Sequence, residues 1–125
     1  MSLDVYLEGP ERKQSCRCVE CWHAHERTAC DTYYSGNITH NLWRMASEAG
    51  IYEALWRPEE IGVSMASSLA PLLRAGLERL RADPEGFKKY VSPNGWGLYV
   101  HFVPFVEEYL AACLEHPDAR VRASR

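Results

Sequence analysis

Soft metal ligands are concentrated in one short segment near the N-terminus, CRCVECWHAH. Cys18 and Cys21 form a C-x-x-C pair, Cys16 precedes them, and His23 and His25 follow. A C-x-x-C turn presents two thiolates to one ion, and structural zinc takes four such ligands in a tetrahedron. The spacing therefore predicts a structural zinc site that is built from Cys16, Cys18, Cys21 and one of the two histidines.

This zinc site has alternatives that the sequence leaves open. Cys30 is a further candidate ligand. The segment lacks the second, well-separated ligand pair that most structural zinc sites have. The main alternative is therefore a polar hairpin whose cysteines bind nothing. A disulfide framework is disfavoured in a reducing compartment. A thioredoxin-like role is disfavoured because this C-x-x-C does not open a helix after a strand. Since no carboxylate base stands beside an open coordination position, we expect zinc to fold a hairpin rather than to catalyse.

A second group of polar residues lies in the stretch NITHNLWRMASEAG, residues 37–50. His40, Arg44 and Ser47 fall on one side of the helix that this stretch predicts, with Asn41 close by. They offer imidazole, guanidinium, hydroxyl and amide groups from neighbouring turns, but no nucleophile and base are evidently paired. The residues on the opposite, apolar face recur at three- and four-residue intervals and are Ile38, Leu42, Met45 and Ala49.

Further candidate ligand-binding residues follow this helix in loops. The sequence NGWG predicts a turn that can expose backbone amides and present the indole of Trp96, while Arg57 and His40 can supply hydrogen-bond donors. Together such groups suit a ligand with a phosphate and a base. The predicted ligand-binding set is His40, Asn41, Arg44, Arg57, Asn94, Trp96 and Tyr99.

Structural roles compete with ligand binding at several of these positions. His40 can cap its own helix, and Trp56 and Trp96 are of a residue type that more often belongs to a core or its rim. Arg57 can pair with a nearby glutamate, Glu59 or Glu60. The joint occurrence of polar and aromatic types beside loops nevertheless favours a pocket.

Helical periodicity dominates the remaining sequence and predicts an α+β fold that is mostly helical. Four to five helices are expected to pack on a small sheet that includes strands from both chain ends, with residues 11–34 as a Cys/His-rich hairpin. Asn37 or Thr39 caps the first helix and Gly50 ends it. The longest apolar helical pattern runs from about Ser64 to Ala82, but Pro71 inside it predicts either a kink or a later start near Ser67 or Ser68. We favour the later start, with Ser68 as its cap. The expected strands are 2–8, ended by Gly9-Pro10, and 120–124, and the expected helices are 37–50, 52–56, 68–82, 83–90 and 99–114.

Length and composition fit one globular domain that spans residues 1–125, because 46% of the residues are hydrophobic and 25% are charged. The formal net charge of −3 provides no global field for duplex nucleic acid. The most apolar run, residues 98–106, is too short to span a membrane. The first residues lack the features of a signal peptide, so a cytoplasmic location is expected.

Several strings carry a resemblance to a known family: MSLDVYL, NITHNL, AGIY-x-x-LWRPEE, NGWG-x-Y and YLAAC-x-x-HPDA. With these strings the chain resembles a family of small proteins encoded by bacteriophages and prophages, over residues 1–8 and about 35–125. The resemblance implies a context, the cytoplasm of a bacterial host, rather than an activity. The cysteine-rich segment is where the family varies, which supports a structural role for any zinc. The polar and turn residues that match are Asn37, Thr39, His40, Asn41, Arg57, Asn94, Gly95, Trp96 and Tyr99.

Three functions follow from these features. The preferred one is a non-enzymatic phage accessory protein that binds a small nucleotide-derived ligand and sequesters an immune signal of the host. The alternative is a protein-interaction module that inhibits a host protein and carries structural zinc, which predicts an exposed apolar patch instead of a polar pocket. The third is a phosphodiesterase that uses His40 with His101 or the metal, although no catalytic motif supports it. A homo-oligomer is compatible with each.

Overall fold

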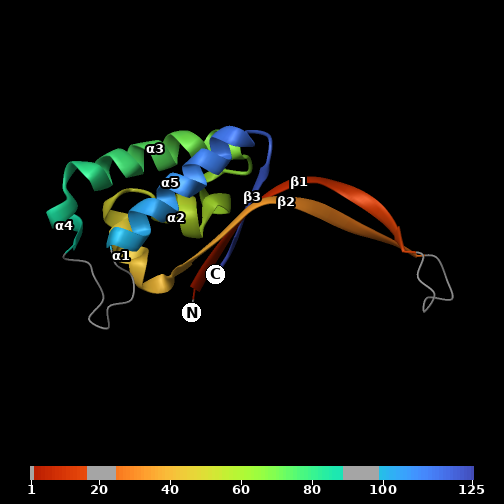
Figure 1. The fold of residues 1–125 in the computed structure, drawn as a ribbon, viewed down its shortest axis with the longest axis horizontal. Coiled ribbons are helices and arrows are strands. Elements are labelled where there is room, and N and C mark those ends of the chain that lie inside the picture. Colours follow the sequence, from red (N-terminus) through yellow and green to blue (C-terminus); the bar gives the residue numbers. More distant parts are fainter. Residues whose placement is uncertain (1, 17–24, 89–98) are drawn as a thin grey trace.

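A three-stranded antiparallel sheet and a group of helices make up the part of the chain that the structure describes (Figure 1). This computed structural model describes the backbone of residues 2–16, 25–88 and 99–125, and the side chains of residues 2–10, 32–87 and 99–125. The strands are β1 (Ser2–Cys16), β2 (His25–Thr39) and β3 (Arg120–Ser124), in the order β2-β1-β3. The α+β fold class is therefore confirmed.

The central strand β1 pairs with β3 on one side and with β2 on the other. Leu3, Val5 and Leu7 are fully buried and alternate with half-buried residues, as expected for a strand that covers a core with one face. The predicted pairing of the two terminal strands is confirmed, because Val5 lies opposite Ala123 and Leu7 opposite Val121.

Beyond this sheet, β1 and β2 continue as a two-stranded hairpin arm, residues 9–16 and 25–31, that extends away from the helices (Figure 1). The prediction that Gly9-Pro10 ends the first strand was wrong. Both residues lie in a register shift between the pairs Glu8–Thr32 and Glu11–Cys30. At such an irregularity the missing N–H of a proline does not cost a hydrogen bond between the strands. A Cβ on Gly9 would stand 2.6 Å from the hydroxyl of Tyr33, so a larger residue there would displace the Tyr33 side chain. Residues 17–24 of the predicted Cys/His-rich hairpin lie outside the described residues.

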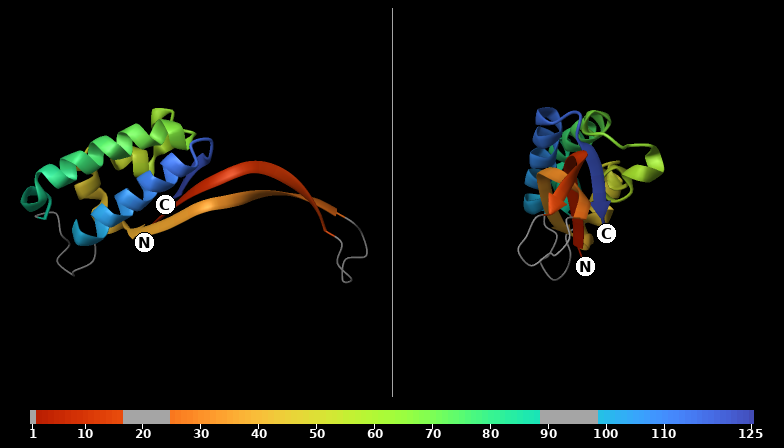
Figure 2. Two further views of the ribbon diagram at one scale, coloured as in Figure 1. Left: turned by 45° about the horizontal axis from the view of Figure 1, so that its top comes forward. Right: turned by 90° about the vertical axis from the view of Figure 1, so that its right-hand side faces the viewer.

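The helices lie together against one face of the sheet (Figure 2). The bounds of the α-helices in the described residues are α1 (Trp43–Glu48), α2 (Tyr52–Trp56), α3 (Ala66–Ala82), α4 (Pro84–Lys88) and α5 (Tyr99–Glu115), and those of the 3-10 helices are η1 (His40–Leu42) and η2 (Pro58–Ile61).

Two predicted helix signals are confirmed around η1 and α1. The hydroxyl oxygen of Thr39 accepts a 3.4 Å hydrogen bond from the backbone N–H of Asn41 and so caps η1. Gly50, at φ +77°, adopts the left-handed conformation after α1 that glycine tolerates best. The segment that they enclose begins as a 3-10 helix and becomes α-helical at Trp43.

The late start predicted for the longest helix was wrong, because α3 begins at Ala66 and Pro71 lies inside it. The first-turn N–H groups of α3 need no side-chain cap, because Ala66 donates to the carbonyl of Ala119 (2.8 Å) and Ser67 to that of Pro117 (3.0 Å). The loop between α5 and β3 therefore sets the start of α3. Pro71 is on the exposed side of the helix.

One continuous apolar core joins the sheet to α1, α2, α3 and α5, and its largest fully buried side chains include Trp56, Tyr109 and Phe102. Gly76 of α3 packs directly against the side chain of Ile51, so a larger residue there would separate α3 from the start of α2. None of the described helices is long and apolar enough to cross a membrane.

Candidate functional site

A cleft of about 560 Å³ lies beside η1 and α2, next to residues that follow β3. Aromatic and cationic side chains line it together, which is the residue composition that the sequence predicted for a ligand site. The lining residues are His40, Trp43, Tyr52, Trp56, Arg57 and Arg125.

Trp56 anchors the aromatic side of the cleft. Its side chain is only 2% exposed, so its position is fixed by the core. Tyr52 stacks on it with ring centroids 5.5 Å apart, and His40 stacks at 6.1 Å. These three residues come from η1 and from successive turns of α2, where positions 52 and 56 share a helix face.

His40 is held by a hydrogen bond as well as by stacking. The indole Nε1–H of Trp56 donates to Nδ1 of His40 at 2.8 Å. Because Nδ1 accepts, it carries no proton, so the neutral imidazole has its proton on Nε2. The bond fixes both the ring orientation and the tautomer and leaves Nε2–H as the donor of His40.

Two arginines supply the positive charge of the cleft. The Tyr52 hydroxyl beside the Arg57 guanidinium, together with Glu60, raises the pKa of Arg57, whose Nη1 lies 3.4 Å from a carboxylate oxygen of Glu60. Arg125 donates to the carbonyl of Trp56 at 2.9 Å and to Glu59 at 2.7 Å. The hydrogen bond from Arg125 holds the pKa of the Glu59 carboxyl below its ordinary value.

The rim of the cleft includes an aromatic ring that is largely open to solvent. Trp43 is 48% exposed, which is unusual for so large an apolar side chain. The guanidinium carbon of Arg44 lies 5.3 Å from the centroid of the Trp43 ring, a cation–π arrangement that keeps a third positive charge near the rim.

The structure brings only part of the predicted ligand-binding set to this cleft. His40 and Arg57 line it, whereas Asn41 and Arg44 are exposed neighbours that do not. Tyr99 does not line it either, because its hydroxyl donates to the carbonyl of Leu80 at 2.7 Å and so joins α5 to α3. The remaining predicted residues, Asn94 and Trp96, lie outside the described residues.

The predicted ligand-binding set did not include four residues that line the cleft, Trp43, Tyr52, Trp56 and Arg125. The i, i+4 spacing of Tyr52 and Trp56 directly before Arg57 could have indicated two of the aromatic positions. No local signal could have indicated Arg125, which reaches the cleft only because β3 pairs with β1 and runs back toward α2.

The predicted zinc ligands all fall within residues 16–25. The side chains of Cys16, Cys18, Cys21, His23 and His25 lie outside the described side chains, as does that of Cys30. Among the side chains that are described, no three His, Cys, Asp or Glu residues come close enough to hold a metal ion. The backbone register nevertheless puts Cys16 directly opposite His25, at the end of the hairpin arm.

The side chains that line the cleft are aromatic or basic. Its six lining residues include no Ser, Thr, Cys, Asp or Glu, and one ring nitrogen of His40 is already engaged. His101, the partner of His40 in the predicted phosphodiesterase, is exposed on α5 and does not line the cleft.

Comparisons with protein-family models, with curated proteins and with solved structures found no match to this chain.

Proposed function

We propose that this protein is a non-enzymatic binder of a small anionic ligand that carries a planar ring, a nucleotide-type molecule. The observation that supports this most directly is the stacked set of Tyr52, Trp56 and His40 with Arg57 at its edge. A nucleotide combines the two properties that such a cleft recognises, an aromatic base and a phosphate.

The exposed rings would hold the base, and the guanidinium of Arg57 with Nε2–H of His40 would hold the phosphate. Trp43 is the ring most open for stacking, since it is 48% exposed. Arg57 is available for a phosphate because its pair with Glu60 is long, at 3.4 Å, and both side chains are well exposed. Surface pairs of this kind contribute at most about 1 kcal/mol, so a phosphate can displace the carboxylate.

Retention rather than turnover follows from the same residues. The lining side chains offer no carboxylate that would activate water, and the one imidazole, that of His40, has no second histidine beside it in the lining. In the phage context that the sequence resemblance implies, a protein that holds a nucleotide without consuming it would sequester a nucleotide-derived immune signal of the host.

Isothermal titration calorimetry with mononucleotides and cyclic dinucleotides tests this proposal. Arg57→Ala is expected to weaken binding by about tenfold to a hundredfold, the range for one charge-assisted hydrogen bond, and Trp43→Ala is expected to weaken it through lost stacking. Arg81→Ala is the matched control, because it removes another exposed arginine, which pairs with Glu107 on α5, away from the cleft.

The fate of the ligand distinguishes a binder from an enzyme. Denaturation of the complex after prolonged incubation should release the nucleotide intact, as chromatography and mass spectrometry would show. Recovery of a cleaved product would overturn the non-enzymatic proposal. Equal affinities for the wild type and for Arg57→Ala would remove the cleft from the binding site.

We further propose that zinc closes the end of the hairpin arm, held by Cys16, Cys18, Cys21 and either His23 or His25. The register that sets Cys16 opposite His25 supports this, because cross-strand neighbours can bind one ion. The paired strands 11–16 and 25–30 contain no large apolar residue. A two-stranded hairpin without a buried face is marginal in water, so a metal cross-link would stabilise the arm.

Metal analysis of the purified protein tests the zinc proposal. We expect one zinc per chain in the wild type, none after the joint substitutions Cys18→Ser and Cys21→Ser, and one after Cys113→Ala. Cys113 is the appropriate control because it is a free cysteine buried on α5 in the helical part of the molecule. Zinc retained by the double variant, or absent from the wild type, would contradict the proposal.

A further inference from the structure

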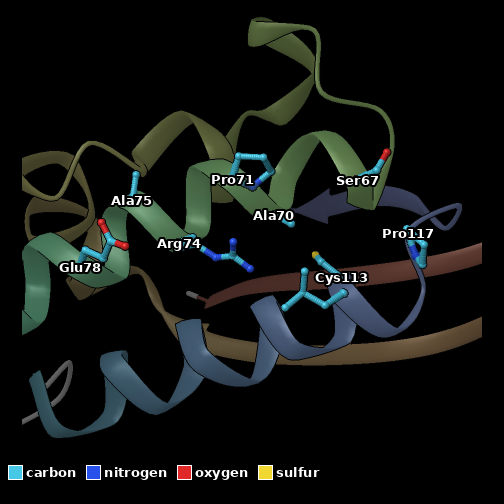
Figure 3. Close-up of a pocket in the computed structure, with 9 residues that line it drawn as sticks. Ser67, Ala70, Pro71, Arg74, Ala75, Glu78, Cys113 and Pro117 are labelled. Atoms are coloured by element: carbon cyan, nitrogen blue, oxygen red, sulfur yellow. The ribbon is translucent and has the colours of Figure 1, made fainter.

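A second hollow, a groove of about 470 Å³, lies between α3 and α5 and does not share any residue with the ligand cleft (Figure 3). Pro71 and Ala75 of α3 form one side of it, and Cys113 and Leu114 of α5 form the other. Leu114 is 54% exposed, so a large apolar side chain borders the groove without being buried in this chain.

Two opposite charges accompany the apolar residues along the α3 side of the groove. Arg74 and Glu78 are one helical turn apart, and with Pro71 and Ala75 they occupy one helix face by the i, i+3, i+4, i+7 spacing. Figure 3 shows the side chain of Arg74 extending from α3 toward α5, with Glu78 further along α3. Among the described residues, neither side chain forms an ion pair or a hydrogen bond, whereas Arg81 one turn further on binds Glu107 at 2.7 Å.

The arrangement is self-complementary under a two-fold rotation. If α3 packs antiparallel against α3 of another copy with the axis between positions 74 and 78, Arg74 of each copy meets Glu78 of the other. The same rotation places Ala75 of each copy beside the axis, and Pro71 and Leu114 border the contact because they line the same groove. Both unpaired charges thereby acquire partners.

We propose that the groove between α3 and α5 is the interface of a two-fold symmetric homodimer, in which Arg74 and Glu78 form reciprocal ion pairs around a small apolar centre. A second copy of the chain fits this surface better than an unrelated partner, because each charge that the groove offers is matched by the other charge of the same groove. The ligand cleft stays open in this dimer, since it lies on other elements.

Sedimentation equilibrium of the full chain tests the dimer through charge reversal. Arg74→Glu alone and Glu78→Arg alone should each raise the dimer dissociation constant by about tenfold or more, because each puts two like-charge contacts into the interface. The joint substitutions Arg74→Glu and Glu78→Arg restore the reciprocal pairs and should return the dissociation constant close to that of the wild type.

An apolar substitution provides an independent check with a matched control. Leu114→Asp should give a monomer, whereas Val100→Asp should leave the dimer intact, because Val100 is equally exposed on α5 but lies at its other end. Circular dichroism establishes that each variant is folded, which is expected since the substituted side chains are exposed.

Three results would overturn the proposal. The first would be a wild type that stays monomeric up to about 1 mM, the range in which even weak association is detected. The second would be a wild type that dimerises with a dissociation constant that the single charge reversals leave unchanged. The third would be a double reversal that weakens the dimer further than the single reversals do, which would place the two charges against other groups.

Discussion

The indole of Trp56 donates a 2.8 Å hydrogen bond to Nδ1 of His40, and this contact joins the apolar core to the candidate ligand cleft. Trp56 is buried at 2% exposure, while His40 is half-buried and lines the cleft. The bond thus transmits the rigidity of the core to a side chain that would touch the ligand. A ligand that needs a donor at Nε2 of His40 meets a ring that is already oriented.

Trp56→Phe is the substitution that isolates this relationship. It keeps an aromatic ring in the core but removes the donor and some volume, so we expect the free energy of unfolding to fall by about 1–3 kcal/mol. Urea denaturation followed by circular dichroism measures this. Trp43→Phe is the control, since Trp43 is 48% exposed and its replacement should cost less than about 0.5 kcal/mol. Equal effects of the two substitutions would contradict the anchoring role of Trp56.

The features of this structure that could be predicted from the sequence are those that depend on interactions between residues close together in the chain. The Thr39 cap and the left-handed Gly50 each act within a few residues and were predicted. The start of α3 was not, because carbonyls of the distant loop before β3 cap its first N–H groups.

The same distinction holds for the candidate site. His40 and Arg57 stand in polar, loop-adjacent stretches and were predicted, but Arg125 joins them only through the pairing of β3 with β1. Tyr99 was predicted for its residue type, yet its hydroxyl serves the packing of α5 on α3. Residue type indicates which groups can bind a ligand, and only tertiary contacts decide which of them meet.

Tyr109→Phe should stabilise the protein. The Tyr109 hydroxyl is buried and has no hydrogen-bond partner among the described residues, so the folded state loses hydration there without compensation. Removing this oxygen should raise the free energy of unfolding by about 1–2 kcal/mol, as measured by urea denaturation. Tyr34→Phe is the matched control on the stacked neighbouring ring, which is only half-buried, and should change stability little. A loss of stability in Tyr109→Phe would show that the hydroxyl has a partner outside the described residues.

Cys113 should make the protein less stable at alkaline pH. Burial raises the pKa of its thiol from about 9 to about 12, so the folded state keeps the proton that the unfolded state releases. The pKa of the Cys113 thiol is higher in the folded state than in the unfolded state. The buried thiol therefore contributes its full stabilisation below about pH 9, and this contribution is lost as the pH rises toward 12. Cys113→Ala should flatten this part of the curve of unfolding free energy against pH. An unchanged slope would assign the alkaline decline to the buried tyrosines, whose pKa values are also raised by burial.

The hairpin arm should be dispensable for the ligand cleft. Glu8 and Thr32 are directly paired across β1 and β2, so the two-residue turn Asn-Gly can replace residues 9–31 and close the strands as a tight hairpin. The buried strand residues Leu3, Val5, Leu7 and Ile38 all remain, and the cleft residues lie beyond the deletion. We expect the shortened protein to keep its helical circular dichroism signal and to bind the nucleotide within about twofold of the wild type, but to bind no zinc. Loss of nucleotide binding in a folded, shortened protein would show that the arm contributes to the ligand site, and the two proposals for this molecule would then have to be joined into one site.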